Sequence, residues 1–179
     1  MTTKKNIFAI IGSASKNSSN LKLVSRIRKL TEEDFDMIIF EGLSGLPPFN
    51  PERSIENTPQ SILDFRAAVL NADGIIICTP EYIFSIPSGL KNAIEWCVST
   101  TVFAQKPIGL ITASANGQKG HEELQLIMKT VETIFTEATT LLIQGIKGKI
   151  DGDGNILDRG TDKDLMNFIR HYKELVIRL

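Results

Sequence analysis

The sequence predicts a three-layer α/β sandwich built on a five-stranded parallel sheet, and two observations support this prediction. First, short apolar runs alternate along the chain with longer amphipathic runs, which is the pattern of repeated βα units. Second, the short runs are apolar on both faces, as strands are when helices cover both sides of a parallel sheet. The length of 179 residues fits one domain, residues 1–179, with helices on both faces of its sheet.

The predicted strands are runs of five or six mostly apolar residues bounded by polar or turn-forming residues. They span Asn6–Ile11, Phe35–Phe40, Gly74–Thr79, Pro107–Thr112 and Thr139–Ile143. Five parallel strands are compatible with a flavodoxin-like strand order or with a small Rossmann sheet.

Apolar residues recur every three or four positions between these runs, which predicts helices. The helical segments are Leu21–Leu30, Ile62–Val69, Ser88–Ser99, Leu124–Phe135 and Leu165–Val176. Thr58 is the expected N-cap of the second of them, with Pro59 in its first turn, and Thr161 is the expected N-cap of the last.

Composition excludes several classes of protein. Lysine and arginine number 20 against 21 acidic residues, a net charge of −1, so the basic face of a nucleic-acid-binding protein is missing. Two cysteines, Cys78 and Cys97, are too few for a disulfide framework or a zinc site, and we expect buried thiols. No apolar run approaches the ~18 residues of a membrane span, and the N-terminal residues do not resemble a secretory signal. We therefore expect a cytoplasmic protein without a membrane or nucleic-acid partner.

Polar side chains gather directly after the first predicted strand. They are Ser13, Ser15, Lys16, Asn17, Ser18, Ser19 and Asn20. Ligands of open α/β sheets bind at the carboxyl ends of strands, and a helix N-terminus offers free N–H groups to an anion. Hydroxyl and amide donors, with the charge of Lys16, predict a phosphate site here. The alternative is plain N-capping, which needs only one of these serines.

The loops after the third and fourth strands complete a candidate site. Pro80–Asn92 carries two prolines and the aromatic residues Tyr82 and Phe84, a platform that suits a flat heteroaromatic ligand. The alternative is that these aromatic residues pack on a neighbouring loop or subunit. Ser114–Gly120 is rich in small residues, which allow a backbone to approach a ligand closely. A mononucleotide such as FMN fits a site with a phosphate end and a flat-ring end.

With these residues in hand, the chain resembles the NADPH-dependent FMN reductase family, which includes flavodoxin-like quinone, azo-dye and chromate reductases. The family's first motif, Gly-Ser-x-Arg-x-x-Ser-x-Asn, corresponds to Gly12–Asn20. Its second motif, Pro-Glu-Tyr-Asn-x-Ser-x-Pro-Gly-x-Leu-Lys-Asn-Ala-Ile-Asp-Trp, corresponds to Pro80–Trp96. The family's arginine is Ser15 in this chain, which removes a bidentate cation, and its asparagine after the tyrosine is Ile83.

The resemblance implies a flavodoxin-like sheet of order 2-1-3-4-5 and an NAD(P)H-dependent oxidoreductase that holds FMN. Hydride would pass from NADPH or NADH by way of FMN to a small acceptor: a quinone, an azo compound, a metal oxyanion or free flavin. The expected cofactor-binding residues are Ser13, Ser15, Lys16, Ser18, Ser19, Asn20, Pro80, Glu81, Tyr82, Ile83, Ser85, Ser114 and Gly117. The family also implies a homodimer or homotetramer. We name no catalytic side chain and no metal ligand, because the flavin supplies the chemistry.

Two other functions are compatible with the same resemblance. One is an electron carrier, although such flavodoxins are usually strongly acidic and this chain is not. The other is a binding or regulatory protein that has lost FMN, which the changes at Ser15 and Ile83 suggest.

Overall fold

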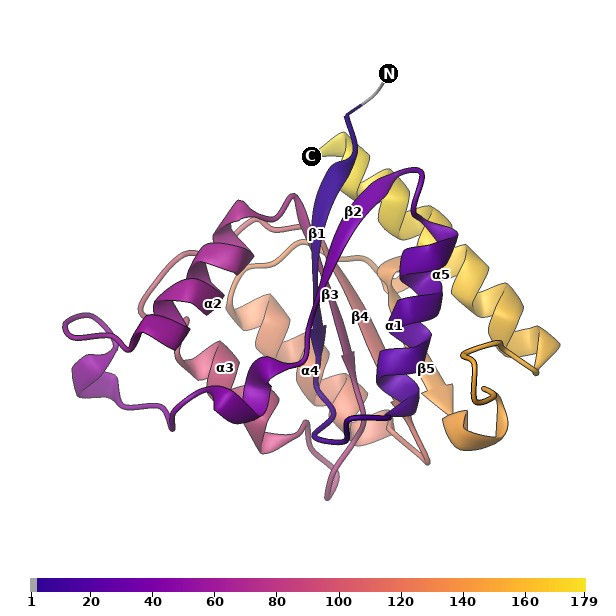
Figure 1. Cartoon of the computed structure of the whole chain (residues 1–179), viewed down its shortest axis with the longest axis horizontal. Helices are drawn as coiled ribbons and strands as arrows, with labels where there is room; N and C mark the ends of the chain where they lie inside the picture. The colour runs from indigo at the N-terminus through magenta and orange to yellow at the C-terminus, as the bar shows by residue number, and fades with distance from the viewer. Residues whose placement is uncertain (1–2) are drawn as a thin grey trace.

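The computed structural model describes residues 3–179 and contains a five-stranded parallel sheet in this part of the chain (Figure 1). The strands are β1 (Lys5–Ile11), β2 (Phe35–Phe40), β3 (Gly74–Thr79), β4 (Ile108–Ser114) and β5 (Thr140–Gln144), in the order β2-β1-β3-β4-β5. All four neighbouring pairs are parallel. The flavodoxin-like order is confirmed, and the Rossmann alternative is excluded.

Helices cover both faces of this sheet, as predicted (Figure 1). On one face lie α1 (Ser19–Leu30) and α5 (Arg159–Arg178), and on the other lie α2 (Gln60–Asn71), α3 (Ser88–Glu95) and α4 (Gln118–Thr130). The carboxyl ends of the strands therefore meet at the edge where α1, α3 and α4 begin.

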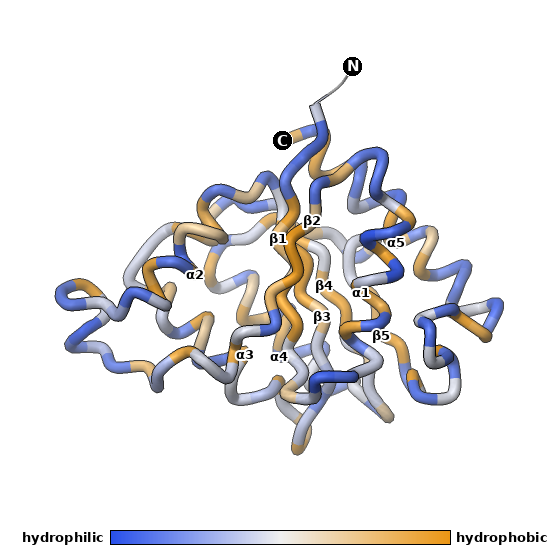
Figure 2. Tube along the Cα trace, in the orientation of Figure 1, coloured by the Kyte–Doolittle hydropathy of each residue, from blue (hydrophilic) through white to orange (hydrophobic). Residues whose placement is uncertain are grey.

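The central strands divide their side chains between two cores. In β1, Ile7, Ala9 and Ile11 pack with α1 and α5, while Phe8 and Ile10 pack with α2, α3 and α4. All five are buried, and each large side chain contributes ~1.5–3 kcal/mol when removed from water. Figure 2 shows the result as a hydrophobic centre between more hydrophilic helices. Burial on both faces explains why these strands lack a polar alternation.

Two predicted helix caps are wrong, because both threonine hydroxyls donate to other oxygen atoms. The N-cap of α5 is Asp158, whose carboxylate accepts a hydrogen bond from the N–H of Thr161 at 2.8 Å. Thr161 thus lies inside the helix. Helix α2 begins after Pro59, and the Thr58 hydroxyl donates instead to the carbonyl of Arg53 at 2.9 Å.

Two helices also end earlier than the apolar stripes predict. Helix α4 stops at Thr130, because Glu132 adopts a left-handed backbone conformation with φ of 61°. Helix α3 stops at Glu95, and the guanidinium of buried Arg66 in α2 donates to the carbonyl of Trp96 at 2.9 Å. The carbonyl of Trp96 thus has a hydrogen-bond donor without a further helical turn.

Both cysteine side chains are buried, as expected. Burial raises the pKa of the Cys97 thiol to about 12, against the opposing charge of Arg66. Burial also raises the pKa of Cys78. Over residues 3–179 the helices are too short or too polar for any of them to cross a membrane.

Candidate functional site

A cavity of about 540 Å³ opens at the carboxyl ends of β1, β3, β4 and β5. This volume is within the range of small-molecule sites, and the position is the one that open α/β sheets use for ligands. Its walls are formed by Ser13, Ser15, Asn17, Ser18, Ser19, Asn20, Pro80, Glu81, Tyr82, Ala113, Ser114, Ala115, Gly145, Ile146 and Lys147.

The start of α1 forms the polar end of the cavity. Ser18 is the N-cap, and its hydroxyl accepts a hydrogen bond from the N–H of Leu21 at 3.1 Å. The next two N–H groups, those of Ser19 and Asn20, are the helix positions that have no intrahelical acceptor. The first turn carries no acidic residue. This end therefore offers free donors and a positive dipole end to an anion.

The side chain of Asn20 connects α1 to two strands, so its amide is already hydrogen-bonded within the protein. Its side-chain amide donates to the carbonyl of Ala113 at 3.2 Å, and its oxygen accepts from the thiol of Cys78 at 3.2 Å. The residue is buried. Asn20 thus holds the start of α1 against β3 and β4, which positions the donors of the loop.

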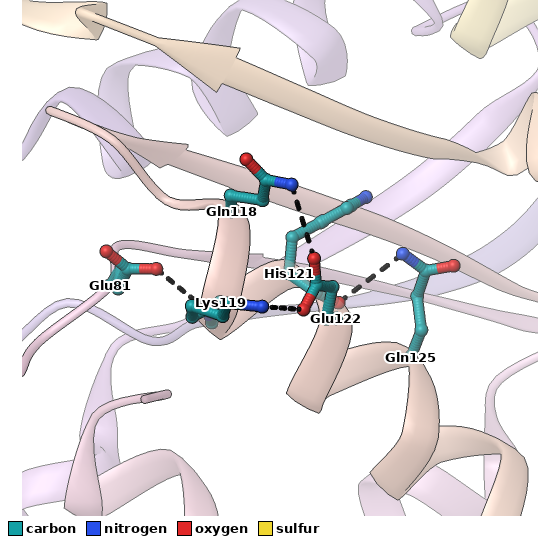
Figure 3. Close-up of polar contacts among 7 residues, drawn as sticks. Glu81, Gln118, Lys119, His121, Glu122 and Gln125 are labelled. Atoms are coloured by element: carbon teal, nitrogen blue, oxygen red, sulfur yellow. Dashed lines mark hydrogen bonds and ion pairs between the residues drawn. The ribbon is translucent and has the colours of Figure 1, made fainter. Parts of the chain in front are cut away.

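The loop after β3 forms the opposite wall, and two carboxylates brace it. Glu81 accepts hydrogen bonds from the N–H groups of Gly117 (3.3 Å) and Gly120 (2.8 Å) at the start of α4, toward which it points in Figure 3. Glu123 accepts from the hydroxyl of Ser85 at 2.6 Å and from the N–H of Ile86 at 2.9 Å. Burial raises the pKa of Glu123, but these bonds and the charge of Lys91 outweigh it, so that the pKa lies below its usual range.

The tip of this loop is a two-residue turn. Tyr82 and Ser85 exchange backbone hydrogen bonds at 2.9 and 3.0 Å. Ile83 and Phe84 between them have φ values of 51° and 59°, which together define a type I′ turn. Their side chains are 94% and 71% exposed. The wall beside the cavity is therefore rigid at Tyr82 and ends in a strained apolar tip.

Nine of the thirteen residues expected from the sequence line the cavity. They are Ser13, Ser15, Ser18, Ser19, Asn20, Pro80, Glu81, Tyr82 and Ser114.

The other four lie elsewhere. Lys16 lines a neighbouring cavity of about 570 Å³ on the β2 side of the first loop. Ile83 points into solvent, Ser85 donates its hydroxyl to Glu123, and Gly117 donates its N–H to Glu81.

One wall of the cavity contains none of the residues expected from the sequence. Gly145, Ile146 and Lys147 follow β5 and approach the start of α1. The signal for this segment is its place after the fifth strand, since ligands of open α/β sheets bind at the carboxyl ends of strands.

Comparison with known families decides the assignment of this architecture. The model of the NADPH-dependent FMN reductases matches residues 5–145, which include all five strands up to the residue after β5. The chain belongs to this family. FMN and a nicotinamide electron donor are the cofactors of NADPH-dependent FMN reductases, as the resemblance implied.

Curated relatives and solved structures agree with membership of the FMN reductase family. A 2-hydroxy-1,4-benzoquinone reductase from a Burkholderia species is 28% identical over 173 residues, 93% of each chain. A quinone reductase of Escherichia coli K12 is 25% identical and covers 100% of this chain and 99% of its own. The flavoenzyme FerB of Paracoccus denitrificans, an NAD(P)H:acceptor oxidoreductase, superposes with a TM-score of 0.83 at 26% identity over 97% of this chain and 98% of its own.

The donors of the cavity fit the FMN of the reductase family. The α1 end offers the N–H groups of Ser19 and Asn20 and several hydroxyls, which suit a phosphate. The carboxylate in the wall, Glu81, is held by N–H groups of α4 and so is compensated. Pro80 and Tyr82 give a largely apolar surface for a ring system.

One titratable group behind the cavity is expected to make stability depend on pH. His121 in the first turn of α4 is buried, and its Nδ1 lies 2.8 Å from the hydroxyl oxygen of Thr112. Burial lowers the pKa of His121, and the charge of Glu122 only partly opposes this. Since the unfolded chain then binds the proton more tightly, the folded state loses stability as the pH falls below about 6.5.

We expect the free energy of unfolding to be insensitive to His121 above that pH and to decline on acidification toward its folded pKa. Urea unfolding at pH 7.5 and pH 5.5 measures the decline, which should be smaller in His121→Gln. An equal decline in both proteins would show that other groups cause it.

Proposed function

We propose that this protein takes reducing equivalents from NADH or NADPH and delivers them, by way of bound FMN, to a small acceptor of the quinone class. The observation that carries the proposal is the cavity, which combines free donors at the start of α1 with an apolar wall at Pro80–Tyr82. The quinone reductases among the relatives support the choice of acceptor.

The residues of the first loop bind the phosphate in this proposal. The hydroxyls of Ser13, Ser15, Ser18 and Ser19 and the N–H groups at the start of α1 supply the hydrogen bonds. The Ser18 hydroxyl accepts from Leu21, which leaves its own hydrogen free to donate. Asn20 acts indirectly, by fixing α1 against the strands.

The residues of the second loop and of β4 orient the ring system. Pro80 and the side chain of Tyr82 form one wall, and Ser114 offers a polar group at the facing edge. The N–H of Tyr82 is used within its turn, so we assign the contact to its side chain. Glu81 keeps this wall in place through its bonds to α4.

FMN, when bound, supplies the redox chemistry by accepting a hydride from the nicotinamide and passing two electrons to the acceptor. The protein contributes position, an anion-binding end and a cavity wall that excludes water from one side. We assign no acid or base, because the carboxylate of the wall, Glu81, already accepts two N–H groups.

An absorption spectrum of the purified protein, followed by anaerobic titration with NADPH and NADH, tests the proposal. We expect flavin bands, bleaching by at least one nicotinamide, and recovery of the bands when a quinone is added. A flavin protein that neither nicotinamide bleaches would instead be an electron carrier. A protein that stays colourless after incubation with FMN would be the binding or regulatory protein. The homodimer or homotetramer stays a prediction, and sedimentation velocity measures it.

A further inference from the structure

Lys147 adds a positively charged residue to the wall of the cavity, and it comes from the segment after β5. Among the side chains that line the cavity, Lys147 is the cation and Glu81 is the anion. Lys147 comes from the segment after β5, beyond residue 145, where the match to the family model ends. The family motifs therefore do not account for it.

The backbone that carries Lys147 is held firmly. Ile146, the residue before it, is buried in the core shared by α1 and α5. Gly145 adopts a left-handed conformation with φ of 65°, and its N–H donates to the carbonyl of Ala115 at 3.1 Å. A short 3-10 turn, η4 (Ile146–Gly148), follows. The position of the lysine backbone relative to β4 is thus determined by packing and hydrogen bonds.

The ammonium group of Lys147 is not neutralised by the chain itself. Within residues 3–179, no carboxylate lies within 4.0 Å of it, in contrast to Lys4, Lys5, Lys91, Lys119 and Lys173. Lys16 has no such partner in this part of the chain either, so the two lysines differ in position and not in pairing. The adjacent start of α1 has no acidic residue in its first turn. Lys147 therefore lines the cavity without a carboxylate partner among the described residues, and the helix start that lines the same cavity adds no acidic residue in its first turn.

The two cations that could bind a phosphate line two adjoining cavities, which share Ser13, Ser15 and Tyr82 as walls. The family's arginine is Ser15 here, and Lys16 lines the neighbouring cavity together with Glu41. Of these two lysines, Lys147 is the one that lines the same cavity as Asn17, Ser18 and Ser19.

We propose that Lys147 is the cation that binds the phosphate of FMN and takes over the charge that is missing at position 15. This inference rests on the proposed function, since it assumes that the cavity holds FMN. A lysine binds a phosphate as a flexible point charge, in contrast to the bidentate contact of an arginine. The hydrogen bond between ammonium and phosphate is charge-assisted and is weakened by salt.

Flavin affinity of the apo-protein, measured by quenching of flavin fluorescence, tests the assignment with FMN and with riboflavin, which lacks the phosphate. We expect Lys147→Gln to weaken FMN binding about five- to tenfold, as for the loss of one charge-assisted bond to a partly exposed group. Riboflavin affinity should change less than twofold. Lys147→Arg should bind FMN at least as tightly as the natural protein, and the loss of FMN affinity between 50 and 500 mM NaCl should be smaller in Lys147→Gln.

Lys149→Gln, two residues along the same loop and outside the cavity, is the matched control and should leave both affinities unchanged. Unchanged FMN binding in Lys147→Gln, or a loss caused by Lys16→Gln instead, would overturn the assignment. An equal loss of FMN and riboflavin would show a structural role for Lys147. If the natural protein binds neither flavin, the proposed function itself fails, which is a separate and recognisable result.

Discussion

Replacing Ser18 by aspartate is expected to weaken FMN binding by more than 100-fold while leaving α1 folded. Ser18 is the N-cap of α1 and lies in the cavity wall. Aspartate is as good an N-cap as serine, and a negative charge there is favoured by the helix dipole, so the free protein loses nothing. Two like charges about 5 Å apart repel by about 3 kcal/mol at an effective dielectric constant of ~20, and a phosphate carries more than one charge.

Ser18→Asn is the matched control for this prediction, because asparagine caps equally well and is neutral. It should retain FMN within about tenfold, the effect of altering one hydrogen bond. Calorimetric titration of both apo-proteins with FMN provides the comparison, and denaturant unfolding should show both within about 1 kcal/mol of the natural protein. If aspartate and asparagine bind FMN equally, the phosphate does not lie at the start of α1.

The layers of the fold could be predicted from the sequence, because a strand that is covered on both faces appears as an uninterrupted apolar run. The strand Gly74–Thr79 is buried at every position, and it was recognised by its uninterrupted apolar run. The prediction of the strand order rested on other evidence. Periodicity was compatible with two orders, and the resemblance to the family favoured the flavodoxin-like one. The predicted caps failed at Thr58 and Thr161, because each hydroxyl donates to an oxygen atom that only the folded loop brings within reach, on Arg53 and on Asp158.

The site was predictable where it follows a strand end and unpredictable where groups distant in sequence compete for a donor. Ser18 lies in the loop after β1, and Ser114 is the last residue of β4. Both line the cavity. Ser85 and Gly117 also lie near strand ends, but carboxylates 38 and 36 residues away take their donors. No local pattern reveals such pairings. Lys147 was not among the expected residues, because no motif marks its segment, and only the burial of Ile146 brings that segment to the cavity.

Replacing Ile83 and Phe84 in their turn by residues that accept a positive φ should stabilise this protein. Both residues have positive φ, a conformation that costs a β-branched or bulky residue ~1–2 kcal/mol and suits asparagine and glycine. The side chains are 94% and 71% exposed, so the chain recovers little of that cost through its own packing. We expect Ile83→Asn combined with Phe84→Gly to raise the free energy of unfolding by about 1–2 kcal/mol.

Thermal unfolding of the apo-protein measures this gain, which corresponds to a rise in Tm of about 2–8 °C for a chain of this size. Ile55→Asn is the control, since Ile55 is 80% exposed but has no positive φ. It removes a similar apolar surface and should change the stability by less than about 0.5 kcal/mol. A loss of stability in the double variant would mean that Ile83 and Phe84 are packed in solution, and a loss that grows with protein concentration would place a second copy of the chain on the tip.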